Sequence, residues 1–562
     1  MSDLFRNAYL ALSNRLRLLR KRRLGYVVLR ARGSFPERNP RRTRPFPLSL
    51  LPWPSPPPSI EAFHDALERL ATDPRVEGIV ILISGLMAGP ATLASLRQAV
   101  GRFRQSGKRV VAYPLDQGMW AYYLAAACDE IWLPEGAGLQ SAGMWSETVF
   151  LKDSLAMLGV EADFEAVGNY KVSPDTFRRS DMSEPHREML ASILASIYEH
   201  VVTAIADGRA LAPGAVRDLL DGVPLTAGRM REAGLADGVC YEDELAARLG
   251  TDGEPATLVT WAEARKRLVR PVRWRSRRAV GVISLEGMIL TGSSRQPPIP
   301  LPLPLPLPEE QAGSETLADQ LRAAARDDAI AAVVLHIDSP GGSSLASDLI
   351  WREVARLREV KPVVVYMSNR AASGGYYVAA PASEIVAQPT TLTGSIGIWG
   401  GKLVTRGLYE KLGANREMVS RGKMAGLYAD DDAFTEEERA RIRDMLGDGY
   451  ARFSARVAEG RNMTGDEVEA VAGGRVWTGA QALEAGLVDA LGDLQFAAGR
   501  ARSLAGMDEA RHVPLVGMAP PKTHLSPLPP TGDETGEWLS GLMGLLREGA
   551  WALAPWQVRI RD

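Results

Sequence analysis

The segment "AAVVLHIDSPGG" (331–342) is the clearest indication of the fold class, because it joins an apolar run to a glycine turn. A short β-branched run closed by glycine is typical of a buried strand. It is followed by "LASDLIWREVARLREV" (345–360), which has helical periodicity, and by "PVVVYMS" (362–368), a second apolar run. Strand, helix and strand in this order predict a parallel α/β layer.

The same order occurs earlier in the chain. A strand is predicted at "GIVILISG" (78–85), a helix at "LASLRQAVGRFRQSGK" (93–108) and a strand at "RVVAYPL" (109–115). Residues 122–145 align without a gap on residues 376–399, and nine of the 24 aligned positions are identical. Self-similarity at a fixed offset indicates copies of one structural unit. We therefore predict a tandem duplication of one α/β domain.

Composition divides the rest of the chain around these two repeats. Within the second repeat, "QPPIPLPLPLPLPEE" (296–310) cannot join a sheet interior, because proline lacks the N–H donor. This segment is either a surface loop or a rim that touches substrate or lipid. The predicted units are a basic amphipathic N-terminal segment (1–44), a Pro-rich linker (45–58), the first repeat (59–250), a connector (251–277), the second repeat (278–505) and a Pro-rich, amphipathic C-terminal tail (506–562).

Composition also limits the function. With 562 residues, of which 46% are apolar and 24% charged, the chain is an ordinary globular protein of several domains. A net charge of −2 gives no bulk attraction to nucleic acid, so we predict no such partner. Cys128 and Cys240 are far apart and predict buried thiols rather than a disulfide. The six histidines show no zinc-ligand spacing, so neither a metal nor another cofactor is predicted.

The two ends of the chain are amphipathic. The first 44 residues hold thirteen Lys and Arg, and their apolar residues recur at roughly helical spacing. This pattern predicts either a helix on an anionic membrane face or a basic docking or solvated helix. The tail "EWLSGLMGLLREGAWALAPW" (537–556) either packs on the body or contacts a bilayer. No run of eighteen apolar residues occurs, so we predict no spanning helix, no clear export signal, and a membrane-associated or cytoplasmic location. The N-terminal apolar residues are Leu4, Phe5, Leu12, Leu16, Leu19 and Leu24.

The segment "DSPGG" (338–342) lies where a predicted strand ends and a helix begins. Paired glycines let backbone N–H groups face an anion without an intervening side chain. Gly341 and Gly342 are therefore candidates for an oxyanion hole, in which one donor lowers the barrier by roughly 3–4 kcal/mol. Taken alone, a Pro-Gly-Gly run is also an ordinary tight turn.

The segment "AASGGYY" (371–377) follows the next predicted strand. A serine among small residues at a strand-to-helix turn exposes its hydroxyl and frees the next amide. Ser373 is therefore a candidate nucleophile, and Gly374 would supply the freed amide. The alternative is a helix start that Ser373 merely caps.

Comparison of the two repeats favours a catalytic role for both "DSPGG" and "AASGGYY". In the first repeat Met119 aligns with Ser373, and Met87 aligns with Gly341. One copy keeps both the candidate nucleophile and the glycine turn, whereas the other copy has lost both. A turn needed only for folding need not disappear together with a distant serine.

A serine hydroxyl is a poor nucleophile until a base takes its proton. No histidine lies close to Ser373 in the sequence, and His336 lies inside an apolar strand, where a core role is expected. Lysine can act as the base if burial lowers its pKa from about 10.4 towards 7–8.

Several motifs together resemble the signal peptide peptidase A family in its long, duplicated form, over residues 59–505. The second repeat carries "IDSPGGS", "ASGGYYVA", "TLTGSIGI" and "VWTGAQALEAGLVD". The first repeat adds "VGNYKVSPDTFRRSDMS" (167–183), which is similar to the lysine motif of the family. Long members typically carry an N-terminal membrane span, whereas the corresponding region here is basic and proline-rich.

The resemblance implies a Clp-protease/crotonase-like fold and a Ser–Lys dyad. It also implies a homotetramer that degrades signal peptides after their release from precursors. Carried onto this chain, the roles are nucleophile for Ser373, base for Lys171 from the other repeat, oxyanion hole for Gly341 or Gly342 with Gly374, and orientation of the lysine for Ser395.

A second lysine is an alternative base. Lys423, in "SRGKMAGL", lies opposite Lys171 at an offset of 252 and fifty residues after Ser373. Single-repeat members of the family keep serine and lysine in one domain at about that separation. Lys423 could therefore form a self-contained dyad, although the fuller motif around Lys171 favours Lys171.

Two other functions remain open beside a serine endopeptidase that cuts apolar, extended peptides. A crotonase-type acyl-CoA enzyme uses the same glycine turns to hold a thioester enolate, and Ser373 would then be dispensable. A non-catalytic membrane-associated scaffold would account for the basic N-terminus and the Trp-rich tail.

Overall fold

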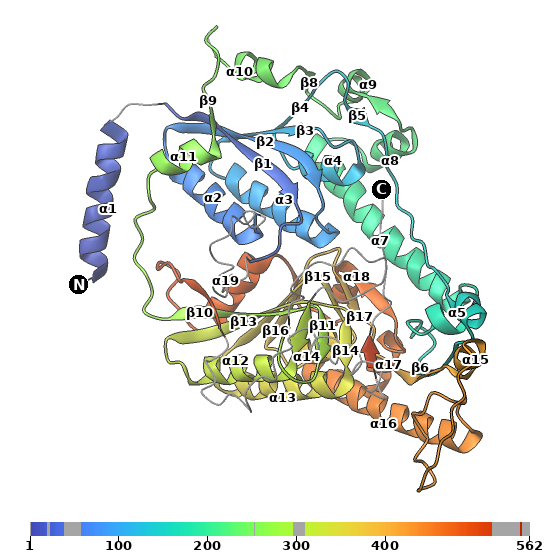
Figure 1. The fold of residues 1–562 in the computed structure, drawn as a ribbon. Helices are drawn as coiled ribbons and strands as arrows, with labels where there is room; N and C mark the ends of the chain where they lie inside the picture. Colours follow the sequence, from blue (N-terminus) through green and yellow to red (C-terminus); the bar gives the residue numbers. More distant parts are fainter. Residues whose placement is uncertain are drawn as a thin grey trace.

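Two α/β units lie one above the other in the computed structural model (Figure 1). The long helix α7 (Glu184–Arg209) extends along one side, from the first unit towards the second. Each unit has its own sheet, so the predicted tandem α/β architecture is confirmed. The structure describes residues 2–19, 23–38, 58–251, 253–295, 310–519 and 551–553.

The sheet of the first repeat has six parallel strands in the order β8-β4-β3-β2-β1-β9. Helices α2 (Ile60–Thr72), α3 (Pro90–Arg104) and α4 (Met119–Ala125) pack on it with the second half of α7 and form one core. The strands are rich in buried aliphatic residues, as is typical of parallel sheets. They are β1 (Gly25–Gly33), β2 (Val76–Leu86), β3 (Arg109–Pro114), β4 (Glu130–Leu133), β8 (Gly238–Val239) and β9 (Leu258–Thr260).

Two strands of this sheet, β1 and β9, come from outside the predicted range 59–250 of the first repeat. Leu24, which helical spacing grouped with the N-terminal helix, instead lies fully buried next to β1. Helix α1 (Ser2–Leu19) ends before it. The basic N-terminal segment therefore contains both a helix and a strand of the first sheet.

The sheet of the second repeat has the order β19-β17-β15-β13-β10-β21, and off this path β16 pairs with β15 and β20 pairs with β16. All of its pairs are parallel except β17–β19. Helices α12 (Ser314–Arg326), α13 (Ser344–Val360) and α14 (Gly374–Ala379) pack on one face, and α19 (Leu494–Leu504) packs on the other. The strands are β10 (Ala279–Glu286), β13 (Ile330–Ser339), β15 (Val363–Ala372), β16 (Glu384–Ala387), β17 (Leu392–Gly394), β19 (Val476–Thr478), β20 (Ala490–Leu491) and β21 (Leu515–Gly517).

Every strand and helix that the sequence predicted in these two layers is present. The second-repeat trio is β13, α13 and β15, and the first-repeat trio is β2, α3 and β3. Both cysteines are buried and free, as predicted. The other elements are β5 (Gly138–Leu139), α5 (Lys152–Leu158), α6 (Asp175–Arg178), α8 (Pro213–Asp221), β7 (Leu225–Thr226), α9 (Ala227–Glu232), η2 (Glu242–Glu244), α10 (Leu245–Arg248), α11 (Trp261–Arg267), α15 (Arg406–Lys411), α16 (Glu436–Arg461), α17 (Gly465–Val471) and α18 (Gly479–Glu484).

A third sheet, β12-β11-β14-β22-β18-β6, joins the two repeats. Strand β6 (Glu161–Val167) of the first repeat pairs antiparallel with β18 (Ile398–Val404) of the second along their whole lengths. Because β6 crosses over in this way, residues 168–183 are held against the second repeat. The remaining strands are β11 (Met288–Leu290), β12 (Gln311–Gly313), β14 (Gly341–Ser343) and β22 (Trp551–Leu553).

Helix α7 reinforces this junction. Its first half packs against Val172 and Val476, and its second half enters the core of the first repeat. By length and composition α7 could cross a membrane, but half of its apolar window is buried inside the protein. The polyproline residues 296–309 lie outside the described residues, as does the tail 537–556 except for strand β22.

A buried polar network also links the two repeats. The Tyr366 hydroxyl on β15 donates a hydrogen bond to Glu37 Oε1 over 2.9 Å and lies 3.0 Å from the Ser95 hydroxyl on α3. The His336 ring stacks on Tyr366, with 5.7 Å between the ring centroids. Burial raises the pKa of Glu37 from 4.5 to about 7.

We expect this carboxyl to make stability depend on pH. Because the pKa of Glu37 is higher in the folded chain, the folded state binds more protons between pH 4.5 and 7, and stability falls as the pH rises through that window. The loss is on the order of 3 kcal/mol. Glu37→Gln keeps an acceptor for Tyr366 and should reduce the fall in Tm between pH 5 and pH 8. Parallel Tm curves for the two proteins would contradict this expectation.

Candidate active site

Ser373 occupies a strained turn between β15 and α14. Its backbone has φ 54° and ψ −114°, which a non-glycine residue rarely adopts. Its amide donates to the Gly394 carbonyl over 2.7 Å, and its carbonyl accepts from the Tyr377 amide over 2.8 Å. Strain of this kind costs on the order of 1–3 kcal/mol and is typical of functional sites.

Lys171 is brought to this turn from the first repeat. It lies just after β6, where the Tyr170 amide donates to the Gly473 carbonyl over 2.9 Å. Gly474 lies so close that a Cβ there would be 2.4 Å from the Lys171 nitrogen, so only glycine fits at this position. The Lys171 side chain is 1% exposed.

The Lys171 amine lies among three oxygens. Its Nζ is 2.7 Å from Ser373 Oγ and 3.1 Å from both the carbonyl oxygen and the Oγ of Ser395. A neutral amine has two N–H donors and one lone pair, so it can donate to both Ser395 oxygens and accept the Ser373 hydroxyl proton. Burial lowers the pKa of Lys171 well below its ordinary value of 10.5, which favours this neutral form.

Ser395 is itself fixed by its backbone. It lies between β17 and β18 with φ 52°, and its amide donates to the Arg475 carbonyl over 2.7 Å. The β17–β19 pairing places Arg475 beside this turn. The family resemblance implied that Ser395 orients the lysine, and the structure places Ser395 next to the lysine amine.

The glycine turn at Gly341 and Gly342 lies next to Ser373, because strand β14 packs against helix α14, which Ser373 directly precedes. Gly341 has φ 104° and its amide donates to Ser339 Oγ over 3.1 Å, so this donor is already engaged. A Cβ on Gly342 would lie 2.0 Å from the Ile289 carbonyl oxygen on β11. Gly374 begins α14, where the first N–H groups have no partner within the helix. Gly342 and Gly374 are therefore the better candidates for oxyanion donors.

Lys423, the alternative base, lies elsewhere. Its side chain is 74% exposed, and its amine pairs with Glu437 over 2.6 Å. The structure therefore brings Lys171, and not Lys423, to the Ser373 hydroxyl.

Sequence reasoning missed the residues that hold the lysine segment in place. Arg475 pairs with Glu188 at the start of α7 over 2.7 Å, and the Tyr170 hydroxyl donates to the same carboxylate over 2.8 Å. The Arg475 guanidinium lies over the rings of Tyr170 and Trp477. The sequence contains one indication: Tyr170 lies in the lysine motif, and Arg475 directly precedes "VWTGAQALEAGLVD". No local pattern, however, predicts a contact between residues so far apart in the chain.

Strand β22, from the C-terminal tail, lies across the glycine turn. It pairs antiparallel with β14, with Gly341 opposite Leu553 and Gly342 opposite Ala552. On its other side β22 pairs with β18 at Trp399. The edge of β14 therefore accepts an extended backbone next to Ser373. A tail expected to be amphipathic supplies that strand, and no sequence signal indicated this pairing.

Comparison with known proteins agrees with the site. The family model described as peptidase family S49 matches residues 102–254 and 355–508, once in each repeat. The chain is 32% identical to "Serine protease SPPA, chloroplastic" of Arabidopsis thaliana, over 83% of this chain and 69% of that one. It is 30% identical to "Protease 4" of Haemophilus influenzae, over 78% of this chain and 72% of the relative.

A shorter relative matches only part of the chain. The "Putative signal peptide peptidase SppA" of Enterococcus faecium is 37% identical over 33% of this chain and 54% of its own. Among solved structures, a mutant of the "1510-N membrane-bound stomatin-specific protease" is 15% identical, with a TM-score of 0.27, over 44% of this chain and 99% of the other.

A buried serine beside a lysine, in an α/β fold that occurs twice, defines a serine-type endopeptidase. The chain belongs to peptidase family S49. The predictions of the family, of the duplicated fold and of a serine endopeptidase are therefore confirmed.

The buried amine should be costly for stability. The pKa of Lys171 is about 10.5 in the unfolded chain and lies well below that value in the folded protein. Between these two pKa values the unfolded chain binds one more proton than the folded protein, so the free energy of unfolding rises with pH in that range. Replacing the amine by an apolar chain of similar length, Lys171→Met, should therefore raise Tm at pH 7. The gain should shrink as the pH approaches 10.5, which calorimetry at several pH values can follow. A lower Tm for the variant at pH 7 would mean that the amine is charged.

Proposed function

We propose that the chain cuts apolar, extended peptides, such as signal peptides released from precursors, with Ser373 as nucleophile and Lys171 as base. The observation that carries this proposal is the 2.7 Å distance between Lys171 Nζ and Ser373 Oγ in a fully buried setting. A base must lie within hydrogen-bond reach of the proton it takes and be unprotonated near neutral pH. Burial favours the second condition, because it lowers the pKa of Lys171 well below its ordinary value of 10.5.

The first half of the reaction forms an acyl-enzyme. The Ser373 hydroxyl proton moves to the Lys171 lone pair as Oγ attacks the carbonyl carbon of the scissile bond. The carbonyl oxygen becomes negative and accepts hydrogen bonds from the Gly342 and Gly374 amides, each lowering the barrier by roughly 3–4 kcal/mol. The C–N bond then breaks, and the Lys171 ammonium gives its proton to the leaving amine.

The second half releases the acyl group. Lys171, neutral again, takes a proton from a water molecule that attacks the ester carbonyl. Collapse of the second tetrahedral intermediate breaks the bond to Ser373 Oγ, which regains the proton from the lysine. Ser395 positions the amine through both of its oxygens during each transfer.

Two features support an extended, apolar substrate. The β14 edge already pairs with the β22 backbone, and a peptide that adds a strand to this edge would gain the same hydrogen bonds. Met288, Leu290 and Trp399 form a buried apolar cluster on β11 and β18, the strands that flank the β14–β22 pair. The name of the Enterococcus faecium relative gives signal peptides as the substrate class.

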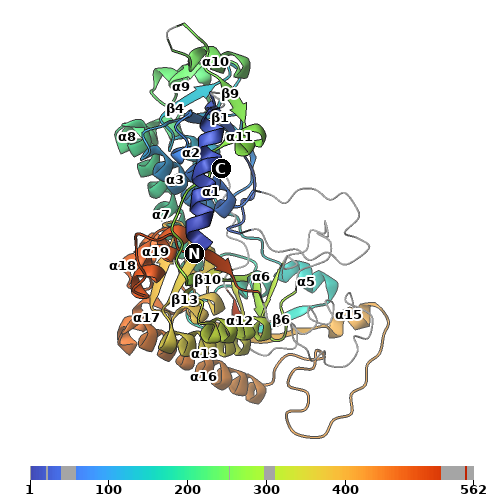
Figure 2. The ribbon, with the colours of Figure 1, turned by 90° about the vertical axis from the view of Figure 1, so that its left-hand side faces the viewer.

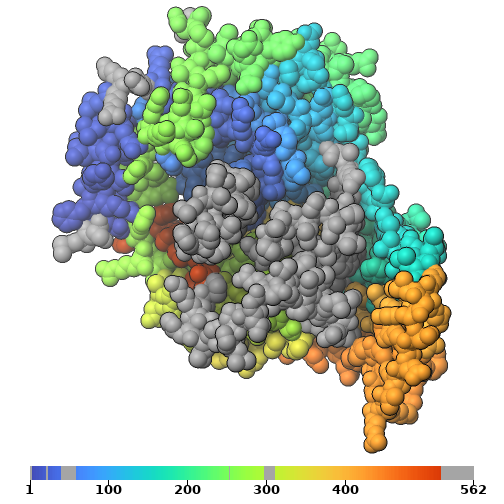
Figure 3. All heavy atoms as spheres, in the orientation of Figure 1, coloured from blue at the N-terminus to red at the C-terminus, as the bar shows by residue number. Residues whose placement is uncertain are grey.

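We also propose that the enzyme works as a homotetramer beside a membrane, as the family resemblance implies. The arm formed by α15 and the following loop projects from the body, in orange at the lower right of Figure 3. It exposes Leu412, Met418 and Val419, the last at 99%. Apolar residues exposed together are typical of a contact with another subunit. The family assignment disfavours the acyl-CoA enzyme and the scaffold as alternatives.

Substitution of the dyad tests the proposal. Ser373→Ala and Lys171→Ala should each lower kcat/KM on an apolar fluorogenic peptide by about 10³-fold or more. The first variant lacks the nucleophile, and the second lacks the base that takes the proton of the nucleophile. Lys423→Ala is the matched control and should retain activity. Ser373 should also be labelled by a fluorophosphonate in the wild type.

Full activity of Lys171→Ala together with loss in Lys423→Ala would reverse the assignment of the base. Activity retained by Ser373→Ala would exclude a serine mechanism altogether. Circular dichroism on each variant separates loss of chemistry from loss of fold.

The position of β22 predicts competition with substrate. Proline at Ala552 removes an N–H and disfavours the strand, so Ala552→Pro should lower KM for the peptide about threefold or more with kcat near wild type. Ala552→Val keeps the N–H and favours the strand, and its KM should be equal or higher. Identical KM values in all three proteins would mean that substrate does not meet this strand.

A further inference from the structure

Helix α1 presents its apolar side to the outside. Phe5, Tyr9, Leu12, Leu16 and Leu19 follow one another at intervals of four and three residues, which places them on one side of the helix. Together with Leu4 these side chains are between 57% and 73% exposed. A surface helix ordinarily buries such a face. Figure 2 shows α1 in dark blue across the front of the molecule.

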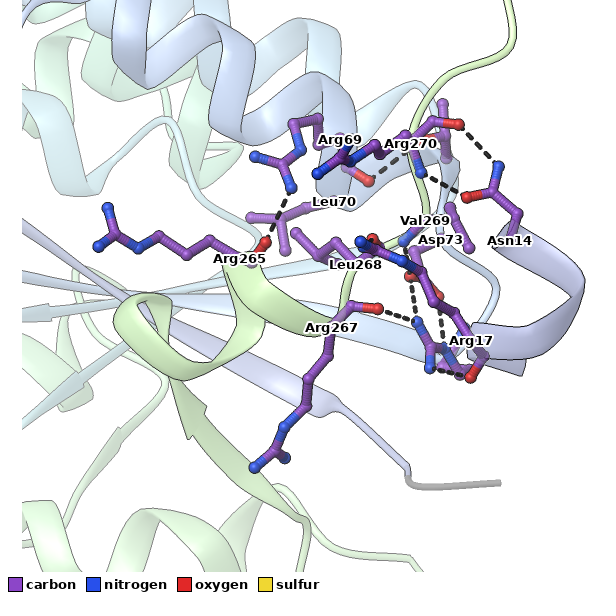
Figure 4. Close-up of polar contacts among 12 residues, drawn as sticks. Asn14, Arg17, Arg69, Leu70, Asp73, Arg265, Arg267, Leu268, Val269 and Arg270 are labelled. Atoms are coloured by element: carbon purple, nitrogen blue, oxygen red, sulfur yellow. Dashed lines mark hydrogen bonds and ion pairs between the residues drawn. The ribbon is translucent and has the colours of Figure 1, made fainter. Parts of the chain in front are cut away.

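The polar side of α1 is fixed to the connector after α11. Asn14 Nδ2 donates to the Arg270 carbonyl over 2.8 Å, and the Arg270 amide donates back to Asn14 Oδ1 over 2.9 Å (Figure 4). Near the other end, Arg6 donates to the Arg273 carbonyl over 2.7 Å, and the Arg275 amide donates to Asp3 over 3.3 Å. Arg17 donates to the Leu268 carbonyl. Because these bonds occur at both ends, the apolar stripe is held outward.

Helix α11 and the chain that follows it, residues 261–278, add positive charge beside this stripe. Residues 261–278 contain eight Lys and Arg against one acidic residue, Glu263. Of these eight, only Arg273 forms an ion pair within the described part of the chain, with Glu68. Val272 and Trp274, also in the connector, are 48% and 53% exposed. The basic residues are Arg265, Lys266, Arg267, Arg270, Arg273, Arg275, Arg277 and Arg278.

Neighbouring side chains show how crowded the positive charge is. Arg69 on α2 donates to the Arg265 carbonyl over 2.9 Å (Figure 4). Its pKa is lowered first by burial and then by the nearby charges of Arg270 and Arg17. Arg15 on α1 and Arg23, just before β1, are exposed and extend the same positive region. Among the described residues, the acidic groups near this region include Asp3, Asp65, Glu68, Glu263 and Asp73. Asp73 is already engaged, because it pairs with Arg75 over 2.8 Å and accepts from the Val269 amide over 2.9 Å.

We propose that α1 and residues 261–278 form a docking face for a bilayer that contains anionic lipids. An outward apolar stripe, a neighbouring tryptophan and unpaired cations are the features of a helix that lies in a membrane interface. Anionic headgroups would neutralise the arginines while the stripe enters the acyl boundary. A second copy of the chain fits less well, because it would bring two positive regions together. This inference rests on the proposal that the enzyme works beside a membrane, and it does not depend on the peptidase chemistry.

Vesicle flotation with the full chain carrying Ser373→Ala tests the proposal independently of catalysis. We expect binding to vesicles of phosphatidylcholine with 30% phosphatidylglycerol, weaker binding in 0.5 M salt, and little binding to phosphatidylcholine alone. Leu12→Ser/Leu16→Ser should weaken binding at least tenfold. Leu345→Ser/Leu349→Ser removes an exposed pair at the same spacing on α13 and should bind as the parent does.

A charge variant tests the second half of the face. Arg15→Gln/Lys266→Gln/Arg270→Gln should weaken binding to anionic vesicles by about tenfold, whereas Arg229→Gln/Arg231→Gln/Arg248→Gln, three exposed arginines elsewhere, should not. Unchanged Tm values show that each variant is folded. Equal binding by parent and face variants would overturn the proposal. So would a Leu12→Ser/Leu16→Ser variant that changes only the oligomeric mass in light scattering, since the stripe would then bind a second copy.

Discussion

The molecule depends on keeping one amine, that of Lys171, out of water and next to one hydroxyl. A charged lysine would be stable there only with a paired carboxylate, and burial alone accounts for its lowered pKa. The dry site exists only where the two repeats meet, because Lys171 comes from the first and Ser373 and Ser395 come from the second. The β6–β18 ladder, the Tyr170–Gly473 bond and α7 are therefore as necessary to the site as the dyad.

The duplication also shows what the strained turn is for. In the first repeat Met119 takes the place of Ser373, lies fully buried, and is already part of helix α4. The residue before it, Gly118, has an ordinary extended conformation with φ −94°. The same supersecondary unit therefore folds without strain when no nucleophile is presented. The strain at Ser373 belongs to the chemistry and not to the fold.

Local patterns predicted the elements and the chemistry, but not the contacts between distant segments. The strand–helix–strand order and Ser373 could be predicted from short motifs and from the alignment of the repeats, whereas the roles of Lys171 and Ser395 were implied by the family resemblance. The pairing of β6 with β18 and of β22 with β14 could not, since it joins segments without complementary patterns. The outward orientation of the apolar stripe on α1 could not be predicted either. Backbone carbonyl groups of Arg270 and Arg273 hold the polar side of the helix, and backbone groups are the same in every sequence.

An enzyme that recognises peptide backbone must keep one strand edge open, and an open edge can also pair with unrelated chains. Strand β14 is such an edge, and its glycines add little side-chain selectivity. Covering it with β22 removes the exposed edge through the same backbone hydrogen bonds that a substrate would use. Three residues make few bonds, so a longer extended peptide that pairs with more of the neighbouring backbone can displace them. Protection of the edge and selection for extended peptides thus follow from one geometry.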